Sequence, residues 1–474
     1  MLPAYDPVLS SRILTMTTLA FHILYATVGV GVPLMIALAQ WRGILKKDPH
    51  YLLLARRWTR GLVVTVAVGV VTGTAIGLQL SLLWPRFMEI AGQVISLPLF
   101  LETFAFFIEA IFLGIYLYTG DRFKNPWIHF LLLIPVVLGS SLSAFFITTV
   151  NAFMNTPQGF VLRNGQMTEI DPLAAMFNPA TPTKASHVLV SAYMASAFLL
   201  ATIAAWHLLR GKAHIYHKKA LHLTMAAALI FSIATAVIGD FSGKFLAEYQ
   251  PEKLAAAEWH FETGKNAPLV LFGILTDNQE IQYGIKIPYA LSILAHSMPW
   301  AEVIGLNQFP PEDRPPLMIH YFFDLMVVIG VALTVLSLLY LFLFYSRKNR
   351  NPYRPALLYG IAAGGPMALI AVELGWVFAE VGRQPWILRG VMRTPEGATT
   401  SPYVDLLLLL FACLYLLLGV MSFVVLRKIF ARHPVEQELA AWEESGKMSL
   451  WRESPGEGEK GDRIGKTPLR GGKG

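Results

Sequence analysis

The sequence has little charge and only one cysteine in 474 residues. Charged residues make up 15% of the chain, whereas about a quarter is usual in a soluble domain. Cys413 has no partner within the chain, which excludes an intrachain disulfide framework and any cysteine-based metal or iron–sulfur site. Metal chemistry, if present, must therefore use histidine, methionine and carboxylate side chains.

The start of the chain lacks the basic segment of a removable signal peptide. No lysine or arginine precedes Arg12, and Asp6 lies before it, so we expect the first apolar segment to stay in the protein. The net charge of +7 comes from basic residues in short loops and in the tail. This distribution indicates membrane topology, and we expect no nucleic-acid partner.

Long apolar segments account for most of the chain, and hydrophobic residues make up 55% of it. Roughly 20 apolar residues are needed to cross about 30 Å of hydrocarbon. Segments of this kind lie at 13–40, 58–83, 98–119, 127–153, 186–209, 219–242, 319–346, 357–381 and 403–430. The sequence therefore predicts an all-α polytopic membrane protein, a bundle of nine transmembrane helices with one extended outer loop.

The charged residues predict the orientation of the chain and the limits of its parts. Lysine and arginine are most frequent in the loops after the first, third, fifth and seventh spans, which places the amino terminus outside and the carboxy terminus in the cytoplasm. The membrane domain then covers 1–442, with an outer loop at 243–318 that contains an alanine-rich, helical-looking run, which we expect to be exposed at the surface. The charged, glycine-rich segment 443–474 is predicted to be a disordered tail.

The stretch 370–386, IAVELGWVFAEVGRQPW, places two glutamates inside an apolar helix. Burying a carboxylate in hydrocarbon costs several kcal/mol, so Glu373 and Glu380 must face a partner, water or a cofactor. At 1.5 Å per residue, Glu373 lies about 12 Å and His22 about 13 Å from the outer ends of their spans. The structural alternative is that His22 bonds a backbone carbonyl and Glu373 pairs with a polar residue.

A second pair of candidate ligands lies near the same outer surface. His187 opens the fifth span, and Met326 lies about 10 Å inside the seventh. An imidazole and a thioether together suit a six-coordinate electron-transfer haem. Met326 alone is a weak signal, because the chain has 16 methionines and most must serve packing.

Glu102 and Glu109 are seven residues apart in the third span and therefore share one helical face. Two carboxylates on one apolar face are typical of a proton relay. The alternative is a structural pair bonded to serines of the fourth span, at Ser140, Ser141 or Ser143.

Several motifs together resemble subunit I of the cytochrome bd-type quinol oxidases, from about Arg12 to Lys428. The most specific are AVELGW at 371–376 and EVGRQPW at 380–386. Supporting motifs are GSSLSA at 139–144, GD at 239–240, KLAA at 253–256 and KIPYA at 286–290. The resemblance implies a haem-containing oxidase subunit that oxidises quinol at the outer face and reduces O2 to water, generating a proton-motive force without pumping.

The resemblance also implies roles for individual residues. His187 and Met326 would be the axial ligands of a low-spin haem b. His22 and Glu373 would serve two closely spaced high-spin haems, a haem b and a haem d or a further haem b in its place. Trp376 and Arg383 would contact a cofactor. Glu102 and Glu109 would supply protons, and Lys253 and Glu258 would take part in quinol oxidation.

The expected partners are subunit II in a membrane heterodimer, a small single-span subunit in some assemblies, menaquinol or ubiquinol, and O2. The expected location is a bacterial or archaeal cell membrane. Asp324 stands where many relatives have arginine and is predicted to lower the low-spin haem potential, because an anion disfavours the reduced form. The rival class is an ion- or proton-coupled transporter with a buried carboxylate relay, which leaves the His22 and His187 pairs unexplained.

Overall fold

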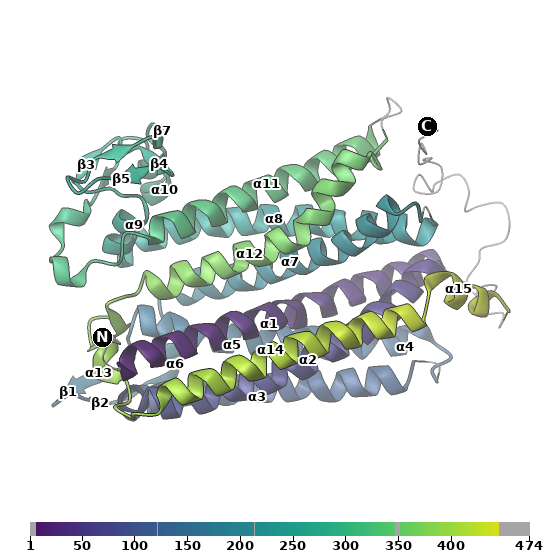
Figure 1. The fold of residues 1–474 in the computed structure, drawn as a ribbon, viewed down its shortest axis with the longest axis horizontal. Helices are drawn as coiled ribbons and strands as arrows, with labels where there is room; N and C mark the ends of the chain where they lie inside the picture. Colours follow the sequence, from purple (N-terminus) through teal and green to yellow (C-terminus); the bar gives the residue numbers. More distant parts are fainter. Residues whose placement is uncertain (1–5, 121, 213, 347–350, 445–474) are drawn as a thin grey trace.

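The computed structural model describes residues 6–120, 122–212, 214–346 and 351–444 (Figure 1). Nearly all of the predicted tail at 443–474 lies outside these residues. Within them, nine helical segments are long and apolar enough to cross a membrane. The segments are α1 (Pro7–Lys46), α2 (Pro49–Leu83), α3 (Pro85–Tyr118), α4 and α5 (Pro126–Leu131, Leu133–Asn155), α7 (Thr181–Leu209), α8 (Ile215–Tyr249), α11 (Ile319–Tyr345), α12 (Pro355–Val381) and α14 (Val404–Arg432). The predicted fold class is confirmed.

Several helices begin earlier than their apolar segments, because polar caps and prolines determine where they start. The Asp6 carboxylate accepts hydrogen bonds from the backbone N–H groups of Val8 at 2.9 Å and Leu9 at 3.2 Å. Pro7 follows at the first helical position, where its missing N–H group costs nothing. Asp48 and Pro49 start α2 in the same way. Hydropathy alone therefore predicts that these helices start several residues later than they do.

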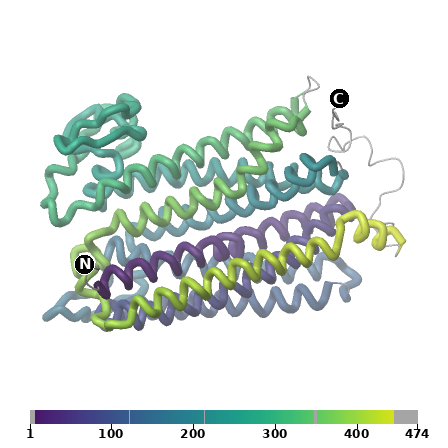
Figure 2. Tube along the Cα trace, in the orientation of Figure 1, coloured from purple at the N-terminus to yellow at the C-terminus, as the bar shows by residue number. Residues whose placement is uncertain are grey.

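The spans form two groups that join along α1, α5 and α7 (Figure 1). In one group α7, α8, α11 and α12 pack around a common interior, and in the other α1, α2, α3, α5 and α14 lie side by side. The tube view shows the same division (Figure 2). The largest core cluster runs through both groups and includes the fully buried Met35, Leu54 and Phe198.

Short elements cover the end of the bundle where α8 ends and α11 begins (Figure 1). They include α9 (Pro251–Ala257), α10 (Ala290–His296) and the antiparallel pairs β3–β8 (Gly264–Lys265, Glu302–Val303), β4–β7 (Leu269–Leu271, Ile285–Ile287) and β5–β6 (Ile274–Leu275, Ile281–Gln282). The pairs β1–β2 (Val161–Arg163, Gln166–Thr168) and β9–β10 (Trp386–Leu388, Met392–Arg393) lie in other connections, with α6 (Pro172–Met176) and α13 (Thr394–Gly397). Because α8 continues to Tyr249, the outer segment between α8 and α11 starts after Tyr249 and not at the expected residue 243.

The helix α15 (Val435–Glu444) follows α14 at the opposite end of the bundle. The Glu438 carboxylate accepts hydrogen bonds from Arg57 at 3.0 Å and Arg60 at 2.5 Å, both on α2. Val435 and Leu439 are buried in the largest core cluster. The described part of the chain past α14 is therefore fixed to the bundle by an ion pair and two apolar anchors.

Candidate functional site

His187 and Met326 lie at the same depth in the group formed by α7, α8, α11 and α12. His187 is six residues past the start of α7 and Met326 seven past the start of α11, so both lie about 9 to 10 Å inside. The two helices begin at the same end of the bundle (Figure 1). The depth of Met326 is the one expected from the sequence, whereas His187 lies deeper than expected, because α7 begins at Thr181 and the apolar segment only at 186.

Glycines on the neighbouring helices leave room beside both side chains. A Cβ atom at Gly375 of α12 would lie 3.0 Å from the Met326 sulfur, and one at Gly239 of α8 would lie 3.7 Å from His187 Cε1. His187 Nδ1 is buried and has no hydrogen-bond partner within the described residues. An imidazole and a thioether with small neighbours are a donor set that would suit an electron-transfer haem.

The His22 ring is oriented by Thr72 of α2. The Thr72 hydroxyl donates to the carbonyl of Val68 at 2.9 Å, so it accepts from His22 Nδ1, which lies 2.8 Å away. The proton therefore sits on Nδ1 and leaves the Nε2 lone pair for another group. An outer hydrogen bond of this kind is how a metal-binding histidine is usually oriented.

Glu373 lies on α12, which contacts α1, the helix that carries His22. Its Oε1 atom is buried and has no hydrogen-bond partner in the part of the chain that the structure describes. The alternative that Glu373 pairs with a polar side chain is thus not observed. An oriented imidazole and an unpaired carboxylate fit the ligation of a high-spin haem.

Glu102 and Glu109 differ in their surroundings. Glu102 Oε1 accepts a hydrogen bond from Ser143 of α5 at 3.0 Å, which is the bond expected for a structural pair. Glu109 is only 5% exposed, and its carboxylate makes no hydrogen bond among the described residues. A Cβ atom at Gly139 would lie 2.8 Å from the Glu109 amide nitrogen, so α3 and α5 are in close contact here.

The second glutamate of the motif, Glu380, lies in a buried polar group that we call the Glu380 cluster: Asn151, Lys184, Lys253, Glu380 and Arg383. The Glu380 carboxylate accepts hydrogen bonds from Asn151 and, at 2.6 Å, from Arg383 Nη2. Lys184 Nζ donates to Asn151 Oδ1 at 2.5 Å. Arg383 keeps two buried groups, Nε and Nη1, without partners within the described ranges. These fit a further anion, such as a haem carboxylate.

Lys253 joins this cluster from α9 and is only 3% exposed. Its Nζ donates to the carbonyl of Ala379 at 3.1 Å and lies 4.7 Å from the centre of the Phe378 ring. Burial lowers the Lys253 pKa to about 7, although the Glu380 charge acts in the opposite direction. The prediction that this alanine-rich run is solvent-exposed is wrong, because α9 packs between the ends of α8 and α11.

Glu258 follows α9, and its side chain points toward a different part of the protein from the side chain of Lys253. It is 0% exposed, and neither carboxylate oxygen has a hydrogen-bond partner among the residues described. Burial raises the Glu258 pKa well above its ordinary value, the charge of Asp324 raises it further, and the backbone amide of Val270 lowers it in part. Lys253 therefore faces the end of α12, and Glu258 faces the start of α11.

Sequence reasoning missed Asn151, Lys184 and His320. Lys184 had a visible signal, since a lysine at the start of an apolar helix needs a partner. Asn151 had none, because a neutral amide is common in helices. His320 lies at a span end, where a histidine is usually interfacial, yet it is 0% exposed.

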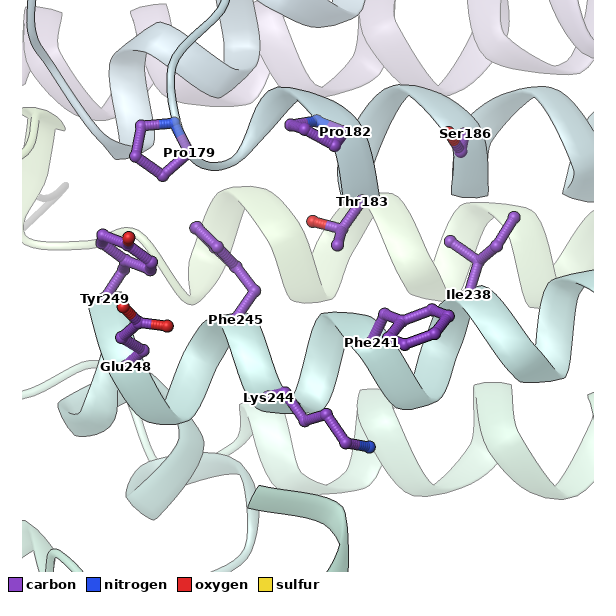
Figure 3. A pocket seen from close by; sticks show the side chains of 10 residues that line it. All are labelled: Pro179, Pro182, Thr183, Ser186, Ile238, Phe241, Lys244, Phe245, Glu248 and Tyr249. Atoms are coloured by element: carbon purple, nitrogen blue, oxygen red, sulfur yellow. The ribbon is translucent and has the colours of Figure 1, made fainter. Parts of the chain in front are cut away.

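A surface groove runs between the first turns of α7 and the last turns of α8 (Figure 3). Its volume is about 420 Å³, and Pro182, Phe241 and Phe245 line it together with Lys244 and Glu248 near one end. None of its lining residues is a predicted site residue. The candidate ligands thus do not line this groove.

The fold and the buried imidazole, thioether and carboxylate groups define a polytopic membrane protein suited to holding redox cofactors between its helices. The sequence model of the cytochrome bd terminal oxidase subunit I family matches residues 10–434, and the chain belongs to this family. The resemblance found in the sequence is thereby confirmed.

Individual relatives agree with this assignment. A candidate cytochrome bd menaquinol oxidase subunit I of Bacillus subtilis (strain 168) is 42% identical over 92% of this chain and 99% of the relative. A cytochrome bd ubiquinol oxidase subunit 1 of the same organism is 31% identical over 88% and 92%. The solved bd oxidase structure from Geobacillus thermodenitrificans has 66% identity and a TM-score of 0.87, covering 91% of this chain and 99% of that one.

Proposed function

We propose that this chain is the haem-carrying subunit of a membrane quinol oxidase that reduces O2 to water. The observation that carries the proposal is the His187 and Met326 pair at matched depth, with Gly239 and Gly375 beside it. Relatives named as menaquinol and ubiquinol oxidases support quinol as the electron donor and leave both quinols as candidates. Haem groups, when bound, would supply the electron transfer and the oxygen chemistry.

The residues divide into three haem sites. His187 and Met326 would hold a low-spin haem b as its two axial ligands. His22 and Glu373 would serve a high-spin pair, a haem b and a haem d or a further haem b in its place. Trp376, which follows Gly375 in α12, would contact a cofactor, and Arg383 would bind a haem carboxylate through its free N–H groups.

Quinol would be oxidised at the outer end of the bundle, where Lys253 and Glu258 lie. Glu258 would accept a proton from the quinol hydroxyl, since its carboxylate is unpaired and excluded from bulk water. Lys253, with its pKa lowered to about 7 by burial, would orient the ring or take the second proton.

Protons released from quinol would leave outside, and protons for water would come from inside. The proposed orientation has the amino terminus outside and the carboxy terminus in the cytoplasm of a bacterial or archaeal cell. A potential would then form without pumping. Subunit II in a heterodimer belongs to the proposal through the family, and a small single-span subunit belongs to it through resemblance alone.

A transporter with a buried carboxylate relay is the alternative function. It would use Glu102 and Glu109 but gives no role to the oriented His22 ring or to His187 and Met326. A reduced-minus-oxidised spectrum of the purified chain with its partners, together with oxygen consumption on quinol, tests the proposal. The absence of haem bands or of quinol-driven oxygen uptake would refute it.

Glu109→Gln is expected to slow proton uptake during oxidation of the reduced enzyme by about 100-fold or more, the range of general acid–base effects. Glutamine keeps the size of the buried side chain but cannot release a proton. Glu89→Gln, at an exposed position on the same helix, is the control and should leave uptake unchanged. Normal uptake in Glu109→Gln would leave this residue only a structural role.

Asp324→Asn is expected to raise the midpoint potential of the low-spin haem, because a nearby anion disfavours the reduced form. For one charge at about 10 Å with an effective dielectric constant near 20, the interaction is worth roughly 1.7 kcal/mol, on the order of 70 mV. The pairing of Asp324 with His320 at 3.2 Å reduces this shift. Redox titration measures it, and an unchanged midpoint would contradict the prediction.

A further inference from the structure

Two polar residues at the start of α11 have no role in the quinol oxidation step proposed above. His320 and Asp324 are four residues apart, and both side chains are 0% exposed. His320 Nε2 lies 3.2 Å from Asp324 Oδ2. Burying such a pair is costly unless its polar atoms are satisfied by further partners, so the partners indicate what the pair does.

The pair holds two separate segments of the outer layer. His320 Nδ1 lies 2.7 Å from the carbonyl oxygen of Ala257, the last residue of α9. At the turn between β4 and β5, the amide of Phe272 donates to Asp324 Oδ2 at 2.5 Å, and its carbonyl lies 3.2 Å from His320 Nε2. Tyr321 adds a hydrogen bond from its hydroxyl to the carbonyl of Gly273 at 2.9 Å.

His320 also contacts the other side of Glu258 through Trp259. The two rings stack with their centroids 3.9 Å apart, and Trp259 Nε1 donates to the carbonyl of Leu317 at 2.9 Å. Ala257 and Trp259, the neighbours of Glu258 in the chain, are therefore both held by His320. Glu258 itself makes no side-chain hydrogen bond within the described residues, so its neighbours determine where its carboxylate points.

We propose that His320 and Asp324 are positioning residues that aim the Glu258 carboxylate at the quinol hydroxyl. The inference rests on the proposed quinol oxidase function and extends it to a pair without an assigned role in quinol oxidation. His320 holds the Ala257 carbonyl on one side of Glu258 and the Trp259 ring on the other, and Asp324 holds His320 and the Phe272 turn. A reacting group misplaced by about 1 Å loses on the order of 100-fold in rate.

The test compares His320→Phe with wild type in the complete membrane enzyme. Phenylalanine keeps a flat ring against Trp259 but removes both hydrogen bonds. His296→Phe, an exposed position at the end of α10 in the same outer layer, is the matched control. Measurements are kcat and KM with quinol, oxygen consumption with an artificial donor that bypasses the quinol site, and the haem spectrum.

We expect His320→Phe to lower kcat with quinol by roughly 10- to 100-fold with little change in KM. The bypass donor and the haem spectrum should behave as in wild type, and His296→Phe should match wild type in every assay. Full quinol turnover in His320→Phe would overturn the proposal, as would equal losses with both donors.

A double-mutant cycle separates positioning from general loosening of the outer layer. Because His320 acts through Glu258, His320→Phe should cost little more once Glu258→Gln is present. Additive losses would overturn the proposal. Loss of quinol oxidation in wild type would instead refute the proposed function itself, so the two failures can be told apart.

If the His320→Phe enzyme does not assemble, His320→Asn and His320→Gln are tested in its place. The amide of asparagine can donate near the position of Nδ1, toward Ala257, and the longer glutamine reaches nearer the position of Nε2. Since the Ala257 bond adjoins Glu258, His320→Asn should retain more quinol turnover than His320→Gln. The reverse order would contradict the proposal.

Discussion

His187→Ala and Met326→Leu are each expected to remove the low-spin haem spectrum while the chain still inserts into the membrane. Each change would remove one of the two proposed haem ligands, and a six-coordinate haem cannot stay low-spin with one. Quinol-driven oxygen uptake should fall by more than about 100-fold, because changes outside the ligand set already cost 10- to 100-fold at metal sites.

Insertion should survive because the spans and the loop charges are unaltered. Met318→Leu is a matched control for Met326→Leu, since Met318 is 53% exposed and precedes the first residue of α11. His296→Ala is the corresponding control for His187→Ala. A normal low-spin spectrum in both ligand mutants would end the assignment of this pair.

The number and order of the spans could be predicted from the sequence because apolar length responds directly to bilayer thickness. The depth of a residue within its span was also predictable, because the rise per residue in a helix is constant. Met326 accordingly lies as deep as expected, whereas His187 lies deeper than its apolar segment indicates, because α7 begins at Thr181. The ends of the helices were not predictable from hydropathy, because Asp6 and Asp48 cap them beyond the apolar segments.

The sequence does not show which helices lie next to one another in the bundle. Nothing in the spacing of Asn151, Lys184 and Glu380 shows that three different helices bring them together. The same holds for α9, whose alanine and charge are typical of an exposed helix. Its burial follows from the layer above it, where Lys253 meets the end of α12 and Glu258 meets α11.

Glu258→Gln is expected to reduce oxygen uptake with quinol by about 100-fold or more, the range for loss of a general base. Glutamine has nearly the same shape but cannot take a proton from the quinol hydroxyl. Oxygen uptake driven by an artificial donor that bypasses the outer layer should remain near wild type. Glu280→Gln, at an exposed position of the same layer, should leave both rates unchanged.

The pH dependence adds a second signature of the same carboxylate. Burial raises the Glu258 pKa well above its ordinary value, so the ionised form that accepts a proton becomes populated only as pH rises through that higher pKa. Quinol turnover in wild type should therefore increase with pH over a range where an ordinary glutamate is already fully ionised. Glu258→Gln should lose this increase, whereas Glu280→Gln should keep it. Equal losses with quinol and with the bypass donor, or an unchanged pH profile in Glu258→Gln, would show that Glu258 is not the proton acceptor.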